Sequence, residues 1–378
     1  MRHRWSLLAL FIVASVTSSV AEAREIRVVV GLRGEPGIIL RVGGRVRHRC
    51  GKDSYAATIP AGTIGILRRA SQVAYVEVDQ VVQMTIAVND PRSSEQWGLG
   101  KVQAPDAWEV SSGGVTIAIC DTGIDGSHPD LAGKVTASVD WTTDTTGMRH
   151  YHGTHVAGIA AAATNNALGV AGTAPGALLL DERVLDSAGA GYDSWLANGM
   201  RDAVARGAKV LNVSLGGRTS STTGQMAVDD SWAAGAVVCC SAGNNGNQTK
   251  TYPAAYANSI AVAASTETDG IASFSNRNGR RDAWVDVAAP GTNILSTLPV
   301  SPNFTKPSKA DGSGYGKLSG TSMAAPLVSG IAALVWASPF QASNVIVRGQ
   351  IQGNCDGVLL TYVAWGRVNA LKAVTVPK

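Results

Sequence analysis

Three short motifs in this sequence carry the side chains that nucleophilic catalysis requires. They are Asp121-Thr122-Gly123, His152-Gly153-Thr154-His155 and the run 320–326, which contains Ser322. A serine hydroxyl is a poor nucleophile at neutral pH unless a base removes its proton. The base in turn needs a carboxylate that fixes its tautomer and stabilises its cation. Asp121, His152 and Ser322 could supply these three groups in one hydrogen-bonded relay beside a cleft.

Each of these three residues falls where a strand or a loop meets a helix. Asp121 follows the apolar run 115–120, so it should lie at the carboxyl edge of a sheet, where open α/β proteins bind ligands. His152 begins an alanine-rich helix, whose positive end favours the neutral imidazole of a general base. Ser322 begins another such helix among small residues, which leave its hydroxyl accessible beside an N-terminus that favours negative charge.

Each motif has a simpler explanation when it stands alone. Asp121 could close an Asx turn, and Ser322 could be only a helix N-cap. An Asp-Thr-Gly motif also occurs in aspartic proteases, but those need two carboxylates that share a proton, and the sequence has no second copy. His155 lies one helical turn after His152, as in a metal-binding pair. The pair lacks the glutamate of H-E-x-x-H and an obvious third ligand, so we expect His155 to be structural.

Length and composition describe a folded protein with room for two domains, and they exclude disorder and coiled coil. The chain has 378 residues, of which 45% are apolar and 16% charged, and its net charge is +4. Residues 24–88 hold ten Lys and Arg against five Asp and Glu, whereas from residue 89 onward there are twenty against twenty-two. Because the basic excess is confined to the N-terminal part, we expect no nucleic-acid partner.

Residues 1–23 predict a secretory signal peptide. Arg2 and Arg4 precede an apolar run over residues 5–13, and the segment ends in Ala21-Glu22-Ala23, a typical cleavage site. The apolar run is well short of the roughly 20 residues that a membrane-spanning helix needs. We therefore expect a secreted protein without a membrane span.

After the predicted signal peptide, the chain has two regions that differ in their pattern of apolar residues. Residues 24–87 hold short alternating runs, such as 26–30 and 75–78, which indicate a small sheet-containing unit that ends near the turn at 89–93. From residue 115 apolar strands, at 115–120, 210–213 and 237–240, alternate with helical stretches, of which 193–206 is the clearest. This pattern predicts a parallel sheet with helices on its faces. Residues 299–316, rich in Ser, Pro, Gly and Lys, predict a surface loop.

The cysteine pattern argues against a zinc site or a redox pair, because no two cysteines have C-x-x-C spacing. Neighbours Cys239 and Cys240 should point to opposite faces of a strand. One disulfide involving Cys355 would be compatible with export, but the sequence names no partner for it. The other cysteines are Cys50 and Cys120.

With these motifs in this order, the chain resembles the subtilisin-like serine proteases over residues 89–378. The order Asp, His, Ser is that of subtilisin. The first residues of this region, at 89–91 and 96–98, resemble those of the thermitase-type branch of the family. The resemblance implies a three-layer α/β/α fold with a mostly parallel central sheet for residues 88–378, and a serine endopeptidase acting on proteins or peptides. Nothing in the sequence indicates an oligomer, so we expect a monomer. The similar stretches are 121–131, 152–158, 212–217, 242–244, 252–256, 285–291 and 319–326.

The resemblance also implies a role for each catalytic residue. Ser322 would attack the scissile carbonyl, His152 would take its proton and later give one to the leaving amine, and Asp121 would orient His152. Asn244 matches the family's oxyanion-hole asparagine, which acts together with the Ser322 backbone amide. Taken alone, Asn244 could equally be a turn residue.

Two glycine-containing segments resemble the strands that flank an extended substrate. They consist of Ser214, Leu215 and Gly216 on one side and of Gly189, Ala190 and Gly191 on the other. Pairing of this kind contacts the substrate backbone, so sequence preference should be loose. The specificity pocket would lie between residues 214–216 and 241–244, with Thr251 near its base. No acidic residue lies in those walls, so we expect an apolar or aromatic side chain before the cut rather than Lys or Arg.

The loop 164–170 is similar to the family's tight calcium loop, and we expect one structural Ca²⁺ there. An ordinary polar turn is the alternative. The available oxygen ligands are the carboxylates of Asp90 and Asp130, the amide of Asn166 and the carbonyls of Thr164, Leu168 and Val170.

Residues 24–87 correspond in position to the family's inhibitory prosegment, and residues 75–79 resemble its closing strand. They would act as an intramolecular chaperone and inhibitor, whose tail near residues 84–88 lies in the cleft and is cut by the enzyme itself. A catalytically silent binding protein of the same fold is the alternative function. Such proteins usually lack one of the Asp, His and Ser residues, and all three are present here.

Overall fold

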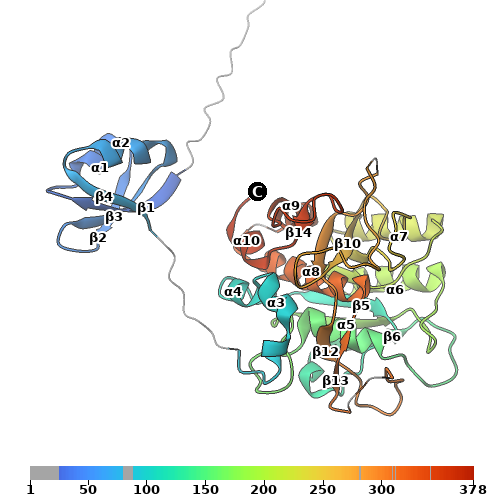
Figure 1. Cartoon of the computed structure of the whole chain (residues 1–378). Helices are drawn as coiled ribbons and strands as arrows, with labels where there is room; N and C mark the ends of the chain where they lie inside the picture. Colours follow the sequence, from blue (N-terminus) through green and yellow to red (C-terminus); the bar gives the residue numbers. More distant parts are fainter. Residues whose placement is uncertain (1–24, 80–87, 281, 309, 311, 341) are drawn as a thin grey trace, which may run out of the picture. The chain divides into compact units, whose positions relative to one another are not determined.

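The computed structural model describes residues 25–79, 88–280, 282–308, 310, 312–340 and 342–378 (Figure 1). The chain divides into two compact units, Met1–Gln83 and Met84–Lys378. The predicted signal peptide at 1–23 lies outside the described residues, as do residues 84–87 of the predicted prosegment tail.

The smaller unit is an antiparallel sheet with two short helices. The strands lie in the order β2-β3-β1-β4, and Val28, Val30, Ile59 and Leu67 belong to a core of their own. Strands are therefore present at both places where the alternation predicts them, 26–30 and 75–78. The elements are β1 (Glu25–Leu32), α1 (Gly37–Arg41), β2 (Arg45–Arg49), β3 (Ser54–Pro60), α2 (Ile64–Arg69) and β4 (Val73–Val78).

The larger unit is built on an eight-stranded sheet in the order β14-β11-β10-β9-β8-β5-β7-β6, and every neighbouring pair is parallel. Parallel strands place their carboxyl ends at one edge, where the loops that follow them gather. The strands are β5 (Thr116–Asp121), β6 (Val135–Asp140), β7 (Leu178–Arg183), β8 (Val210–Val213), β9 (Val237–Ser241), β10 (Ser259–Ser265), β11 (Val287–Pro290) and β14 (Gly366–Arg367).

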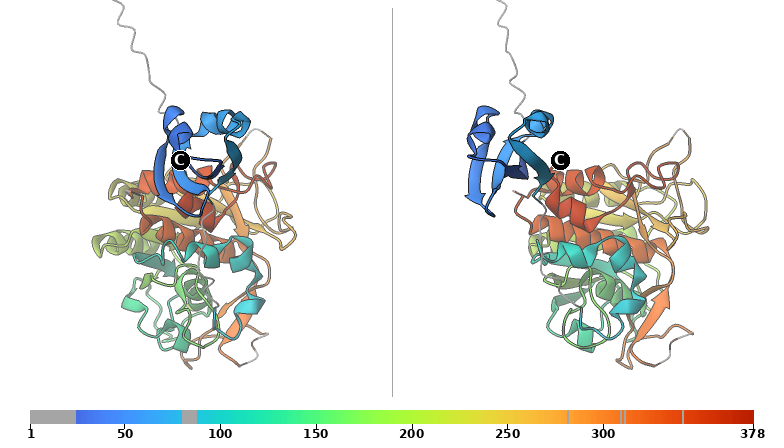
Figure 2. Two further views of the ribbon diagram at one scale, coloured as in Figure 1. Left: turned by 90° about the vertical axis from the view of Figure 1, so that its left-hand side faces the viewer. Right: turned by 60° about the vertical axis from the view of Figure 1, so that its left-hand side comes forward.

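Helices cover both faces of this sheet, and successive strand residues alternate between two cores (Figures 1 and 2). Ile117 and Ile119 pack with α5 (His152–Ala161), α8 (Thr321–Trp336) and α9 (Asn344–Gly353). Ala118 and Cys120 pack on the other side with α6 (Asp193–Ala205) and α7 (Thr222–Ala233). The predicted three-layer α/β/α arrangement is confirmed.

Shorter elements complete the larger unit. Helix α6 ends one residue before the predicted end, and Gly207 follows with a φ of 87°, a left-handed conformation that suits a glycine stop. The remaining elements are α3 (Trp97–Lys101), α4 (Ala104–Ala107), α10 (Ala370–Thr375), the short 3-10 helices η2 (Ser93–Glu95) and η3 (Pro129–Leu131), and the hairpin of β12 (Ile294–Thr297) with β13 (Tyr315–Leu318).

Most described residues of the segment 299–314 form a surface loop, as the composition predicts, but the segment has a buried anchor. Phe304 is buried, and the backbone around it pairs with Arg149: Arg149 N–H donates to the Asn303 carbonyl and Thr305 N–H to the Arg149 carbonyl, both at 2.8 Å. The predicted loop 299–316 ends in β13, which begins at Tyr315. One aromatic residue, Phe304, anchors the segment among polar neighbours. The average composition of the segment does not predict this buried contact.

Cys239 and Cys240 belong to the two opposite cores, as predicted for neighbours on a strand. All five cysteines lie in the described part of the chain, and none of them forms a disulfide. Over the same described residues, no helix is both long enough and apolar enough to cross a lipid bilayer.

Candidate active site

Asp121 and His152 are paired at the carboxyl edge of the sheet. Asp121 ends β5 and is fully buried, and His152 begins α5. The His152 Nδ1 atom is 2.8 Å from Oδ1 and 3.0 Å from Oδ2 of Asp121, and the Thr122 N–H donates to Oδ1 at 2.8 Å. Because Nδ1 is occupied by this pairing, Nε2 is the ring nitrogen that can accept a proton.

The close approach of α5 to β5 depends on a glycine. The Gly153 N–H donates to Thr122 Oγ1 at 2.9 Å, and that hydroxyl donates to the His150 carbonyl at 2.9 Å. A Cβ at position 153 would lie 2.5 Å from the Gly123 carbonyl oxygen, which is too close for any side chain. The Gly after His152 therefore fixes how near the imidazole can come to the carboxylate.

The surroundings of His152 change its proton affinity in two opposing ways. Burial disfavours the charged ring, but the charge of Asp121 and its hydrogen bond favour it more, so the pKa of His152 is raised above its ordinary value. His155 has no such partner: its Nε2 atom is 3.0 Å from the Gly316 carbonyl, and burial lowers its pKa to about 3. His155 is thus held neutral in the core, as expected of a structural histidine.

Ser322 lies in the first turn of α8, and two reciprocal hydrogen bonds tie it to the end of β8. The Ser322 hydroxyl donates to the Ser214 carbonyl at 3.1 Å, and the Ser214 hydroxyl donates to the Ser322 carbonyl at 2.9 Å. Asn212 Nδ2 donates to the Ser214 hydroxyl at 2.9 Å, and Asn212 Oδ1 accepts from Ser329 at 3.0 Å. This buried chain of hydrogen bonds holds the helix start against the sheet.

The relay expected between Asp121, His152 and Ser322 is therefore only partly formed. Its carboxylate–imidazole half is present, whereas within the described residues the Ser322 hydroxyl is bonded to the Ser214 carbonyl and not to His152. A hydroxyl turns to the nearest acceptor when no substrate is bound, and rotation about its Cα–Cβ bond changes that acceptor.

Asn244 is held with its amide nitrogen available. Its Oδ1 atom accepts from the Thr321 N–H at 2.9 Å and from the Thr321 hydroxyl at 3.0 Å. Because a backbone N–H can only donate, the oxygen must face Thr321, and Nδ2 must face away. Among the described residues Nδ2 has no acceptor, and Asn244 lines the same cavity as Ser322.

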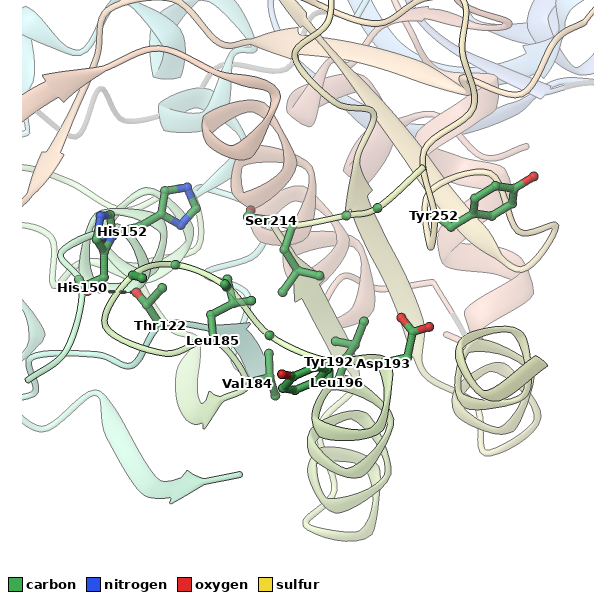
Figure 3. Close-up of a pocket in the computed structure, with 17 residues that line it drawn as sticks. Thr122, His150, His152, Val184, Leu185, Tyr192, Asp193, Leu196, Ser214 and Tyr252 are labelled. Atoms are coloured by element: carbon green, nitrogen blue, oxygen red, sulfur yellow. Dashed lines mark hydrogen bonds between the residues drawn. The ribbon is translucent and has the colours of Figure 1, made fainter. Parts of the chain in front are cut away.

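Two adjoining cavities form a cleft beside these residues. The first, of about 610 Å³, has His150 and His152 at one end and Tyr192, Asp193 and Tyr252 at the other (Figure 3). The second, of about 310 Å³, contains Ser322 and Asn244, and residues 215–217 belong to both. Every substrate-binding residue predicted from the sequence lines this cleft. The first cavity is lined by Gly189, Ala190, Gly191 and Ser214, the second is lined by Thr251, and both are lined by Leu215 and Gly216.

Several residues that line the cleft were not predicted from the sequence. Arg218 and Asn245 line the second cavity and bond to each other, with Arg218 Nη2 donating to Asn245 Oδ1 at 2.9 Å. His150, Tyr192 and Tyr252 line the first cavity. Arg218 and Asn245 directly follow the motifs 214–217 and 242–244, so their adjacency to those motifs was the available signal.

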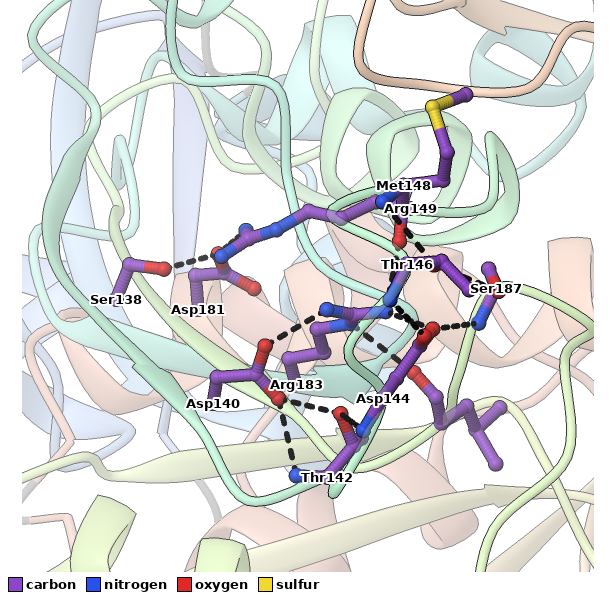
Figure 4. Close-up of polar contacts among 11 residues, drawn as sticks. Ser138, Asp140, Thr142, Asp144, Thr146, Met148, Arg149, Asp181, Arg183 and Ser187 are labelled. Atoms are coloured by element: carbon purple, nitrogen blue, oxygen red, sulfur yellow. Dashed lines mark hydrogen bonds and ion pairs between the residues drawn. The ribbon is translucent and has the colours of Figure 1, made fainter.

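A buried arginine ties together the two segments that flank the first cavity. Arg183 forms ion pairs with Asp140 at 2.7 Å and Asp144 at 2.8 Å, and it donates to the Met148 carbonyl at 2.8 Å (Figure 4). Asp144 also accepts from the Ser187 N–H at 2.8 Å. The loop that leads to His152 and the segment that leads to Gly189 are therefore fixed by one side chain.

The carboxylates of Asp90 and Asp130 lie together against the loop 164–170. Both are buried; Asp90 accepts from the backbone N–H groups of Asn165 and Asn166, and Asp130 accepts from Asn166 Nδ2 at 3.0 Å and the Val170 N–H at 2.9 Å. Burial and the charge of Asp130 raise the pKa of Asp90 against these hydrogen bonds.

Carboxylate and amide oxygens are the ligands that a hard cation such as Ca²⁺ prefers. Within the described residues the two carboxylates accept from N–H groups of the loop, and no ion pair reaches either of them. The Asn166 Oδ1 atom accepts from the Leu168 N–H at 2.9 Å, so a cation would require the amide to turn. Of the predicted ligands, the side chains of Asp90, Asp130 and Asn166 meet at this loop. The described residues contain no cluster of three or more Asp, Glu, His or Cys side chains suited to a metal.

A carboxylate, an imidazole and a serine hydroxyl at the carboxyl edge of a parallel sheet are the components of a serine hydrolase. Residues 112–353 match the model of the subtilase family, Peptidase_S8. The chain is 47% identical over 292 residues to thermitase of Thermoactinomyces vulgaris, an alignment that covers 76% of this chain and 98% of thermitase. It is 37% identical over 323 residues to subtilisin E of Bacillus subtilis, covering 83% and 79% of the two chains.

A solved protease from Pseudoalteromonas arctica superimposes with a TM-score of 0.67 at 30% identity, over 77% of this chain and 99% of that one. The chain therefore belongs to the subtilase family, in its thermitase branch, and it is a subtilisin-like serine endopeptidase.

The opposing influences on His152 predict how its ring titrates. In a Ser322→Ala protein, which avoids self-digestion, NMR should give His152 a pKa above the ordinary value of about 6.5. In Asp121→Asn the pKa should fall below that value, because burial then acts alone. His155 is the internal control and should stay neutral down to pH 5 in both proteins. An unchanged His152 titration in Asp121→Asn would refute the pairing.

Proposed function

We propose that Asp121, His152, Ser322 and Asn244 form the catalytic machinery of this endopeptidase. The observation that carries the proposal is the buried Asp121–His152 pair, with Nδ1 held at 2.8 Å and Nε2 left to accept a proton. In the reaction the Ser322 hydroxyl turns from the Ser214 carbonyl to His152 Nε2, gives up its proton and attacks the scissile carbonyl carbon.

The resulting tetrahedral intermediate carries its negative charge on the former carbonyl oxygen. Asn244 Nδ2 and the Ser322 backbone N–H, at the positive end of α8, are the donors for this oxyanion. His152 then passes its proton to the leaving amine, the peptide bond breaks, and water releases the acyl group from Ser322 by the same proton transfers. In a subtilisin on which it has been measured, loss of one such donor lowers kcat by about 10²–10³-fold.

The substrate lies extended between residues 189–191 and 214–216, and the side chain before the cut enters the cavity that contains Thr251. Glycines on both sides let a backbone approach closely; a Cβ on Gly216 would lie 2.7 Å from Thr251 and 2.8 Å from the Tyr252 carbonyl. Among the described residues no acidic side chain lines that cavity, so apolar or aromatic residues are preferred over Lys and Arg. A peptide library cut mainly after Lys or Arg would contradict this preference.

The N-terminal residues serve export and maturation. Residues 1–23 act as a signal peptide, and residues 24–87 as a chaperone and inhibitor that the enzyme removes from itself, so the mature protein is a secreted monomer. A separate α+β core in residues 25–79 supports a prosegment that folds as a unit.

One structural Ca²⁺ would be held by Asp90, Asp130, Asn166 and the carbonyls of Thr164, Leu168 and Val170. Two neighbouring buried carboxylates at this loop support the site. The ion would neutralise their mutual repulsion and tie the chain around Asp90 to the loop that follows α5.

Replacement of the nucleophile tests both catalysis and maturation. Ser322→Ala should lower peptide hydrolysis by about 10⁶-fold, the loss measured for the equivalent change in a subtilisin. Mass spectrometry should find the uncut 24–378 form in this variant. In the native enzyme a sulfonyl fluoride should modify Ser322 and abolish activity. Normal processing of the Ser322→Ala protein would instead assign maturation to another protease.

Removal of calcium tests the metal site. In the Ser322→Ala background, EDTA should lower the Tm by about 5 °C or more, because an ion at 100 times its Kd contributes about 2.7 kcal/mol. Asp130→Asn should have a low Tm that EDTA barely changes. The matched control is Asp106→Asn, an exposed carboxylate in α4, which should respond to EDTA as the parent does. An EDTA-insensitive parent would eliminate the site.

A further inference from the structure

Arg218 is the charged side chain in the wall of the cavity that contains Ser322. It follows Gly217 at the end of the segment that begins with Ser214, and it is exposed. The cavity's other lining residues are uncharged: Leu215, Gly216, Gly217, Ser241, Gly243, Asn244, Asn245, Thr251 and Ser322. In the part of the chain that the structure describes, the place where a substrate side chain would enter thus has a positive charge and no negative one.

The backbone on both sides of the cavity fixes the position of this charge. Gly217 and Tyr252 exchange two backbone hydrogen bonds of 2.8 Å, which anchor the chain immediately before Arg218. The Asn245 N–H donates to Asn276 Oδ1 at 3.0 Å, and the Asn245 side chain accepts from Arg218 Nη2 at 2.9 Å. A neutral side chain therefore holds the guanidinium at the rim without cancelling its charge.

Two cations near this part of the chain have partners of their own. Lys250, next to Thr251, forms an ion pair with Asp282 at 3.1 Å, and Arg277 donates to the Gly246 carbonyl at 2.9 Å. Within the part of the chain that the structure describes, Arg218 has no carboxylate partner and spends one of its five N–H donors on Asn245. The remaining donors can bind a carboxylate, with the two parallel bonds that guanidinium groups form with such groups.

We propose that Arg218 is a specificity-determining residue that makes this pocket accept an acidic side chain, such as glutamate, immediately before the cut and disfavour lysine. The inference rests on the proposed function, in which Ser322 is the nucleophile and this cavity receives the side chain before the scissile bond. The proposed preference for apolar side chains says nothing about which charged residues are cut best. The role of Arg218 adds that acidic residues are accepted better than lysine.

The expected size of the effect is modest because the rim is open to water. Exposed ion pairs are weak and are screened by salt, whereas partial removal of water by a bound peptide strengthens them. We expect Arg218 to favour glutamate over its uncharged isostere glutamine by about 5-fold in kcat/KM, and to disfavour lysine by a similar factor.

The test uses the mature enzyme and three peptides that differ only in the residue before the cut, which is Glu, Gln or Lys. In Arg218→Gln the Glu:Gln ratio of kcat/KM should fall about 5-fold and the Lys:Gln ratio should rise. Asn245→Asp, which places a carboxylate against the guanidinium, should likewise lower the Glu:Gln ratio and raise the Lys:Gln ratio. Arg218→Lys, which keeps the charge, should retain most of the native ratios, and 1 M salt should reduce the native Glu:Gln ratio.

The matched control is Arg201→Gln, which removes an exposed arginine on α6 that is paired with Asp230 and does not line the cleft. It should leave all three constants unchanged. Native ratios that persist in Arg218→Gln, while Ser322→Ala abolishes cleavage, would overturn the role of Arg218 and leave the proposed function standing. Full activity in Ser322→Ala would overturn both.

Discussion

The buried hydrogen bond between Asp121 and His152 is the constraint on which the rest of the site depends. A carboxylate withdrawn from water is costly unless donors surround it, and here the imidazole and the Thr122 N–H provide them. The two residues are 31 positions apart and lie on different elements, so their pairing requires α5 to start directly over the end of β5. Gly153 makes that approach sterically feasible, because the Cβ of any other residue at this position would collide with the Gly123 carbonyl oxygen.

The other half of the site is held by a second, independent set of contacts. The reciprocal bonds between Ser214 and Ser322 join the end of β8 to the start of α8, so the proposed nucleophile and the proposed substrate-binding segment are tied to each other. Arg183 does the same for the loop before His152 and the segment before Gly189. Arg218, to which we assign a role in substrate selection, is exposed on this fixed frame, where substitution should change recognition without disturbing the core.

Much of this arrangement could be predicted from local pattern. The strands β5, β8 and β9, the start of α5 and α8 and the opposite faces of Cys239 and Cys240 all follow from periodicity and from where glycines interrupt it. Three features could not. The partner of the Ser322 hydroxyl depends on a rotamer, the burial of Phe304 on a contact with Arg149, and the environment of Arg218 on chain segments near residues 217, 245 and 252 that meet only in the folded protein.

The central claim is that folding brings Asp121, His152, Ser322 and Asn244 around one reacting carbonyl. A crystal structure of the mature enzyme with a peptide boronic acid, a mimic of the tetrahedral intermediate, tests this most directly. We expect a bond from Ser322 Oγ to boron, with one boronate oxygen about 2.7–3.1 Å from both Asn244 Nδ2 and the Ser322 N–H. Attachment to another residue, or a boronate oxygen directed away from Asn244, would contradict it.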